Sequence, residues 1–161
     1  MAKPTSWDLY TPEKYGFDAD QLERFVTSSE YCFMARLRRD GHPIGAYYGV
    51  FHKAGQSFVT TNVFRKAYEA VKRDPRITVV FAKHNVGEVT IIGRGEIVDD
   101  RPLTEQFFLE KAPTNFRVAS GEWTVEQFMR TACSENRRLI RVVAERIVSS
   151  DLMKLPLNDE D

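Results

Sequence analysis

Residues 57–81 read SFVTTNVFRKAYEAVKRDPRITVVF, and this stretch decides the fold. A strand of β-branched and aromatic residues runs into Thr60-Thr61-Asn62, and a short basic helix follows from about Phe64 to Arg73. Asp74-Pro75 ends that helix, because the residue before a proline is pushed out of helical geometry. Hydroxyls, amide donors and the cations Arg65-Lys66 therefore meet where a strand enters a helix, which predicts a phosphate site.

The residues before this stretch predict an antiparallel meander. Residues 31–39 read as a strand that places Phe33, Ala35 and Leu37 on one side and Cys32, Met34, Arg36 and Arg38 on the other. Asp40-Gly41 is a strong two-residue hairpin turn. A second strand over residues 43–52 and a third over 56–61 are joined by a turn at Lys53-Ala54-Gly55.

Helices and further strands surround the meander. Asp18 and Gln21 fit the N-cap and its partner for a helix through about Ser28. Gly93 and Gly95 interrupt a later strand, which predicts a bulge or a bend at a barrel corner. The remaining expected elements are strands over 76–83, 88–98 and 139–149, helices over 100–111 and 125–136, and an irregular segment over 113–121.

About six short strands, mostly consecutive and antiparallel with helices in the connections, predict a mainly β fold. The bends marked by glycine favour a closed or split barrel over a doubly wound sheet. A chain of 161 residues is expected to form one domain, with residues 1–16 as an extended arm and 157–161 as a frayed acidic tail.

Composition narrows the function classes. The chain has 23 basic and 23 acidic residues, and this balance argues against a general nucleic-acid binder. No apolar run reaches the roughly 20 residues that span a bilayer, and the first residues lack the apolar block of a secretory signal. A cytoplasmic protein with Cys32 and Cys133 packed as reduced thiols is expected, although two cysteines also permit one disulfide.

The Asp-Gly hairpin, the strand ending in Thr-Thr and the run RKAYEAVKRDPRITVVF resemble the pyridoxamine-phosphate-oxidase-like split β-barrel superfamily. That superfamily includes flavin- and deazaflavin-dependent oxidoreductases. Lys66 matches a lysine common in its members, and residues 72–77 match the segment that follows. Ala70-Val71 stands where members usually carry Asn-Leu. The order of elements fits from about Asp18 to Met153.

The resemblance implies a six-stranded antiparallel split β-barrel of the FMN-binding type. It places the cofactor phosphate against Thr60, Thr61, Arg65 and Lys66. It places the ring over the second and third strands, near Tyr47, Tyr48, Gly49 and Val50. Tyr47 and Tyr48 point to opposite faces of a strand, so at most one of them faces the ring. Glycines at positions 45 and 49 are expected to let a flat ligand approach closely.

The implied function is an FMN-dependent oxidoreductase acting on a small organic substrate, as a homodimer that holds the cofactor between its subunits. A reductase that uses the deazaflavin F420 is the first alternative, and Arg36, Arg38 and Lys53 are candidates for the basic groove that its carboxylate tail would favour. A non-catalytic flavin- or haem-binding protein and a structural dimer with an empty pocket are further alternatives. Residues 102–123 are expected to form part of the substrate pocket.

The residues themselves name no catalytic side chain. His42, His52 and His84 fit no zinc-binding spacing, no nucleophile-elbow motif occurs, and neither cysteine has an obvious local base, so no metal and no acid or base is assigned. Without the resemblance, Arg65-Lys66 is more simply a pair of solvated charges on a helix.

Overall fold

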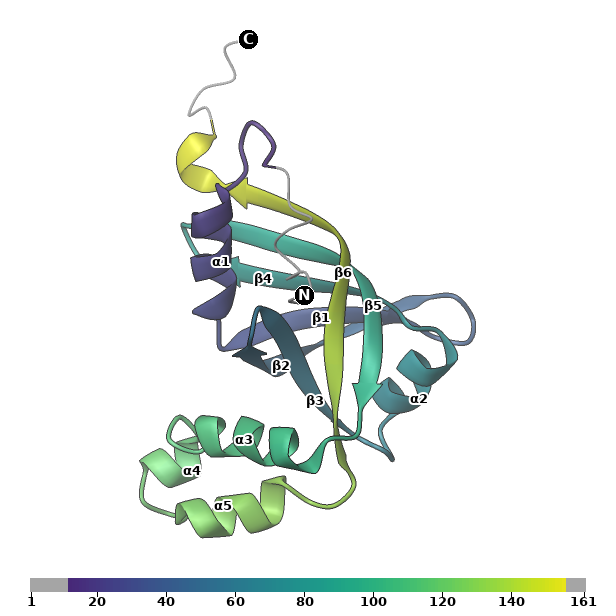
Figure 1. Ribbon diagram of the computed structural model, residues 1–161, viewed down its shortest axis with the longest axis vertical. Coiled ribbons are helices and arrows are strands. Elements are labelled where there is room, and N and C mark those ends of the chain that lie inside the picture. Colours follow the sequence, from purple (N-terminus) through teal and green to yellow (C-terminus); the bar gives the residue numbers. More distant parts are fainter. Residues whose placement is uncertain (1–11, 156–161) are drawn as a thin grey trace.

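The computed structural model of the protein describes residues 12–155 and shows an antiparallel six-stranded β-barrel with helices at its ends (Figure 1). The strand order around the closed barrel is β1-β2-β3-β6-β5-β4. The strands are β1 (Tyr31–Leu37), β2 (Pro43–Lys53), β3 (Gln56–Asn62), β4 (Arg76–Lys83), β5 (Gly87–Val98) and β6 (Arg137–Asp151). The described helices are α1 (Ala19–Thr27), α2 (Lys66–Arg73), α3 (Arg101–Lys111), α4 (Phe116–Ala119), α5 (Val125–Ala132) and the 3-10 helix η2 (Leu152–Lys154).

This architecture confirms the predicted fold class, and several local predictions are also confirmed. Asp18 and Gln21 form the expected capping box of α1. The β5–β6 ladder shifts register between Ile92 and Gly93, which is the expected irregularity. A Cβ atom at Gly93 would lie 2.0 Å from the Val143 carbonyl oxygen, so only glycine fits this close approach of the two strands. The predicted arm falls partly, and the acidic tail wholly, outside the described residues.

The main core fills the inside of the barrel. Inward side chains alternate with outward ones along every strand, as the pleat requires. Each fully buried aliphatic side chain contributes roughly 1.5–3 kcal/mol to burial. The largest fully buried apolar residues of this cluster are Leu22, Val26, Met34, Val50, Val59, Val79, Phe81, Val89, Ile91 and Ile140.

A second apolar cluster lies on the outside of the barrel, under α3 and α5 (Figure 1). Phe51, Phe58 and Leu139 project outward from β2, β3 and β6. They pack against Phe107 of α3 and Phe128 of α5 and their neighbours. Phe107 and Phe108 are both buried in this cluster, which places them in the core.

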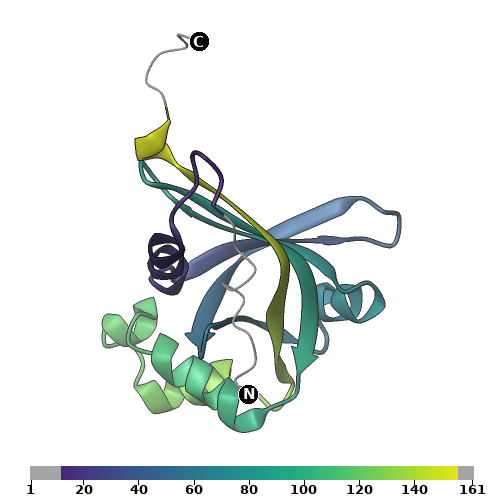
Figure 2. The same cartoon turned by 45° about the horizontal axis from the view of Figure 1, so that its top comes forward.

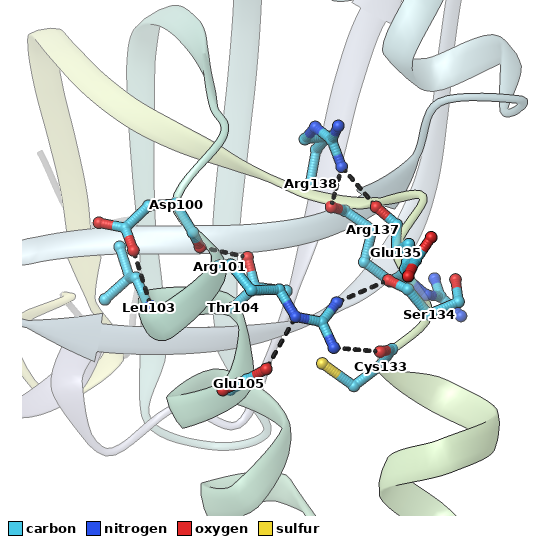
Figure 3. Close-up of polar contacts among 10 residues, drawn as sticks. All are labelled: Asp100, Arg101, Leu103, Thr104, Glu105, Cys133, Ser134, Glu135, Arg137 and Arg138. Atoms are coloured by element: carbon cyan, nitrogen blue, oxygen red, sulfur yellow. Dashed lines mark hydrogen bonds and ion pairs between the residues drawn. The ribbon is translucent and has the colours of Figure 1, made fainter.

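Arg101 holds these helices against the barrel (Figure 3). Its guanidinium donates to the Cys133 and Ser134 carbonyl oxygens at 2.8 and 3.0 Å, and its Nε pairs with Glu105 at 2.8 Å. Because these carbonyls lie in the connection after α5, that helix ends at Ala132, whereas the sequence predicted it to continue to about Asn136. None of the described helices has the length and apolar character that crossing a membrane requires.

Candidate functional site

Strands β2 and β3 separate after a short paired stretch. They pair from Lys53↔Gln56 to Val50↔Val59. From Pro43 to Gly49, β2 pairs with β1 and with no other described strand. From Thr60 onward, β3 pairs only with β6 among the described strands. The split therefore presents two unpaired strand edges, whose backbone amides and carbonyls can bind a ligand.

Helix α2 begins at Lys66, four residues after β3 ends at Asn62. The turn that leads into it is held by Asn62, whose side chain accepts from the Phe64 amide at 3.0 Å and whose carbonyl accepts from the Arg65 amide at 2.8 Å. Arg65 is the N-cap residue, and its side chain makes no capping hydrogen bond. Among the described residues, the Tyr68 amide donates to the Arg65 carbonyl at 3.0 Å, and the Lys66 and Ala67 amides remain as donors for an anion at the positive end of α2.

A cavity of about 590 Å³ lies between α2 and the projecting β1–β2 hairpin. In both views, α2 sits beneath the end of this hairpin (Figures 1 and 2). Arg73, at the end of α2, donates to the Leu37 carbonyl at 2.8 Å and so fixes the helix to the hairpin. We call this space the basic cavity, because cations outnumber acids on its walls; its lining includes Arg36, Arg38, Arg39, Lys66 and Arg73 with Asp40 and Glu69.

Arg73 contacts the hairpin. It lies one helical turn from Glu69, a spacing that also permits an ion pair. Arg73 uses the Leu37 carbonyl instead, because the hairpin folds over the helix. Arg76 forms a two-pronged pair with Asp74, and this pairing lowers the pKa of Asp74 to about 2. Arg76 thus supports the end of the helix.

The two cations at the start of α2 point to different neighbours. Lys66 lines the basic cavity, and Arg65 is not part of its lining. Arg65 lies near Arg137 instead: burial lowers the pKa of Arg137, and the charge of Arg65 lowers it further. Arg137 donates to the Ala132 carbonyl at 2.7 Å. Of the predicted pair, Lys66 has the position that suits a phosphate in the cavity.

Thr60 and Thr61 end β3 with hydroxyls that are buried and have no hydrogen-bond partner among residues 12–155. Strand alternation points them to opposite faces, because Phe58 belongs to the outer cluster and Val59 to the barrel core. The structure therefore does not bring both hydroxyls to one phosphate. A buried hydroxyl without a partner is unfavourable, which suits a site that a ligand completes.

The predicted ring site is divided between the two faces of β2. Tyr47 is 79% exposed on the outer face and meets Phe33 edge-to-face, with ring centroids 5.5 Å apart. Tyr48 points inward and packs against the core, and Val50 is buried. A Cβ at Gly49 would have nothing within 4 Å, so the outer face is open there.

Gly45 does not open the strand to a ligand as the sequence suggested. A Cβ atom at this position would lie 2.1 Å from the ring of Phe33. The glycine accommodates that side chain, which covers the outer face at this point. The open outer surface of β2 therefore lies at Gly49 rather than along the whole strand.

Arg36 and Arg38 reach the basic cavity, whereas Lys53 does not. The buried Nε of Arg36 has no partner among the described residues, and its Nη1 lies 3.4 Å from the Tyr48 hydroxyl. Lys53 contacts the Gln106 side chain at another part of the surface. Cys32 and Cys133 are both free and buried, and burial raises the pKa of Cys32 to about 12. Among residues 12–155, no cluster of side chains fits a metal ion.

One family model matches most of the chain, and solved structures share its fold. The model of the family described as pyridoxamine 5'-phosphate oxidase matches residues 19–149, whereas no curated protein matches the chain. The conserved hypothetical protein Rv2991 of Mycobacterium tuberculosis has a TM-score of 0.71 at 20% identity, over 94% of this chain and 98% of that one. An F420 reductase has a TM-score of 0.59 at 18% identity, over 86% and 98%. General stress protein 26 of Bacillus anthracis has a TM-score of 0.58 at 18% identity, over 80% and 93%. At these identities the structures share the fold.

Proposed function

The chain belongs to the pyridoxamine 5'-phosphate oxidase family, and from that premise we propose that it is an oxidoreductase that binds FMN in the split and acts on a small organic substrate. One observation carries the proposal. The strands β2 and β3 separate beyond Val50 and Val59, and β3 then leads into α2, which begins with a lysine and has no side-chain cap. A flat ring and a phosphate need these two features side by side.

Positive charge favours binding of the cofactor phosphate at the start of α2. Lys66 contributes a cation to the basic cavity, and the uncapped first turn of α2 contributes amide donors. Arg36 adds a guanidinium group whose Nε is buried and has no partner among the described residues. A dianionic phosphate satisfies such donors better than water does in a partly enclosed site.

The unpaired edge of β2 favours binding of the cofactor ring. The β2 edge from Tyr47 to Gly49 faces the split and has no strand partner there among the described residues. Its backbone donors and acceptors suit the polar edge of a flavin-type ring, and the open face at Gly49 leaves room beside it. A bound ring of this type supplies hydride or electron transfer, and the protein orients it.

F420 is the second candidate, favoured by the arginines of the basic cavity. Arg36, Arg38 and Arg39 line one wall, beyond what one phosphate needs. A cofactor with a carboxylate-bearing tail would use them as additional partners. FMN and F420 share the phosphate and the flat ring, so both fit the split.

We include a homodimer in the proposal. The outer face of β1, β2 and β4 carries a continuous apolar row, because Phe33 lies opposite Tyr47 on one side and Val80 on the other. Ile92 of β5 adds to this face and is 41% exposed. Such a surface suits a second copy of the chain, and a partner there would cover the open face of the split. A cytoplasmic location is part of the same proposal.

Titration of the purified full chain with FMN and with F420, followed by absorption and fluorescence, tests the function. Lys66→Ala is expected to weaken cofactor binding by about 1.5–3 kcal/mol, the range for a charge-assisted hydrogen bond. Lys72→Ala is the matched control, because Lys72 belongs to the same helix and does not line the cavity.

If neither cofactor binds, the proposed function is wrong. Equal affinity of the wild type and the Lys66 variant would remove the phosphate assignment alone. Binding without turnover of any reducible substrate would instead identify a carrier or sensor.

A further inference from the structure

A second, smaller cavity of about 220 Å³ lies where the outer face of the barrel meets α3 and α5. This is the volume of roughly seven water molecules at about 30 Å³ each, enough for one substituted ring. We call it the aromatic pocket. The residues that matter here are Tyr31, Gly49, Phe107, Phe108, Lys111 and Phe128.

Four aromatic residues line the pocket. Phe107 and Phe108 meet edge-to-face with ring centroids 5.0 Å apart, and Phe108 meets Phe128 at 6.1 Å. All three are buried and belong to the outer cluster. Tyr31 forms the rim and is 63% exposed. A planar aromatic ligand gains both apolar burial and ring-edge contacts from such walls.

Lys111 is the one cation of the lining, at the end of α3. Its side chain is half-buried, and within residues 12–155 its ammonium makes a single long hydrogen bond, 3.4 Å, to the Glu30 carbonyl. Burial lowers the pKa of Lys111, while the carboxylates of Glu30 and Glu110 act in the opposite direction. A partly desolvated ammonium with only a long hydrogen bond is a strong donor that an anion can accept from.

We propose that the aromatic pocket binds a small planar aromatic molecule with one carboxylate, which pairs with Lys111 while the ring packs among the phenylalanines. A single cation matches a monoanion. The basic cavity, with its several arginines and Lys66, is the place for a phosphate. Glu30 lines the aromatic pocket and competes with the ligand for Lys111.

The pocket also lies beside the split. Gly49 lines it and is the residue of β2 immediately before the pairing with β3 begins at Val50. A ligand in the pocket would therefore lie next to a ring held by the β2 edge. We assign the aromatic carboxylate to the substrate class, and this role rests on the proposed function, whereas binding itself does not.

Calorimetric titration of the full chain with benzoate, in the absence of any cofactor, tests the binding. Lys111→Met keeps the aliphatic stem and is expected to weaken benzoate binding by on the order of tenfold or more. Lys53→Met is the matched control, because Lys53 is exposed and contacts Gln106 of α3 without lining the pocket. Benzyl alcohol, the neutral analogue, should bind the wild type weakly and show no loss in Lys111→Met.

Variants at two exposed positions test the proposal even if Lys111→Met fails to fold. Glu30→Gln is expected to tighten benzoate binding several-fold, because it removes the competing carboxylate. Tyr31→Ala should weaken benzoate binding while leaving the melting temperature unchanged. If benzoate does not bind, or binds Lys111→Met as well as the wild type, the proposal is overturned. If benzoate binds as described but no flavin or deazaflavin does, the proposed function fails and the ligand site stands.

Discussion

Val50 pairs with Val59 at the point where β2 and β3 part. Both side chains point into the barrel and are at most 1% exposed. The pair therefore seals the core at the level where the strand edges become free. Beyond it, one end of the barrel is solid core and the other offers unpaired backbone, so the fold builds a binding site without weakening its centre.

The unpartnered hydroxyl of Thr61 allows stability and binding to be separated. Thr61→Val is expected to raise the free energy of unfolding of the cofactor-free protein by about 1 kcal/mol, because it removes a buried polar group that has no partner among the described residues. The same change should weaken binding of FMN if the ligand uses the hydroxyl. Urea denaturation and cofactor titration measure the two effects.

Ser57→Ala is its matched control on the same face of β3. The Ser57 hydroxyl lies 3.0 Å from Nδ1 of His52, so its removal should cost about 1–3 kcal/mol. A destabilised Thr61→Val protein would show that the hydroxyl has a partner in the free protein.

Tyr47→Asp is expected to shift the protein from dimer to monomer. The tyrosine is 79% exposed at the β2 end of the apolar row, and a buried unpaired charge is strongly unfavourable in an interface. Sedimentation equilibrium measures the change. Met153→Asp, at a position 84% exposed in η2, should leave the association unchanged. A wild-type monomer at high concentration would contradict the dimer.

His52 makes stability depend on pH. Burial lowers the pKa of His52 in the folded protein, and the charge of Lys111 acts in the same direction. The unfolded chain therefore takes up the proton first. The stabilisation is complete above the unfolded pKa of about 6.5 and is lost as the pH falls through the lower folded value.

Denaturation at pH 7.5 and 5.5 checks this sign. The wild type should lose more stability on acidification than His52→Gln does. His84→Gln changes an exposed turn residue and should follow the wild type. If the wild type and His52→Gln lose the same stability between pH 7.5 and 5.5, His52 is not the group that makes stability depend on pH.

Arg101→Ala is expected to lower the free energy of unfolding by about 1–2 kcal/mol, because the guanidinium group donates hydrogen bonds to the Cys133 and Ser134 carbonyls after α5. Arg130→Ala removes an arginine of α5 that pairs with Glu126 in an exposed i,i+4 pair and should cost at most about 0.5 kcal/mol. Thermal unfolding of both variants makes the comparison. Equal effects would mean that the hydrogen bonds of Arg101 drawn in Figure 3 stabilise the folded protein no more than a surface ion pair does.

Local patterns predicted the elements that depend on local physics. The helix after Asp18 and the strand after Pro75 were predictable because capping, proline geometry and alternation act within a few residues. The start of α2 was expected near Phe64 and lies at Lys66, because Asn62 holds the intervening turn.

What was not predictable depends on contacts between distant residues. Residues 116–119 form the short helix α4 where an irregular segment was expected, and Asn115 caps it. Strand β6 extends from Arg137 to Asp151, beyond the expected 139–149, because it pairs along its length with β5 and β3. Residues 102–123 were expected to form part of a pocket, and Lys111 of the aromatic pocket lies in that range. The contribution of Tyr31 was not predictable, because Tyr31 and Lys111 are far apart in sequence and only the folded chain brings them together.

The place of β6 in the barrel also has a consequence for how the chain folds. Strand β6 lies between β3 and β5 in the barrel, and its partners on β3 lie about 80 residues earlier in the sequence and are synthesised long before it. The ring of strands cannot close until β6 has formed, so we expect folding to be limited by this distant pairing, on the millisecond-to-second scale typical of β topologies. While β6 is being synthesised, β3 keeps an open edge, and the nascent protein is then most exposed to aggregation.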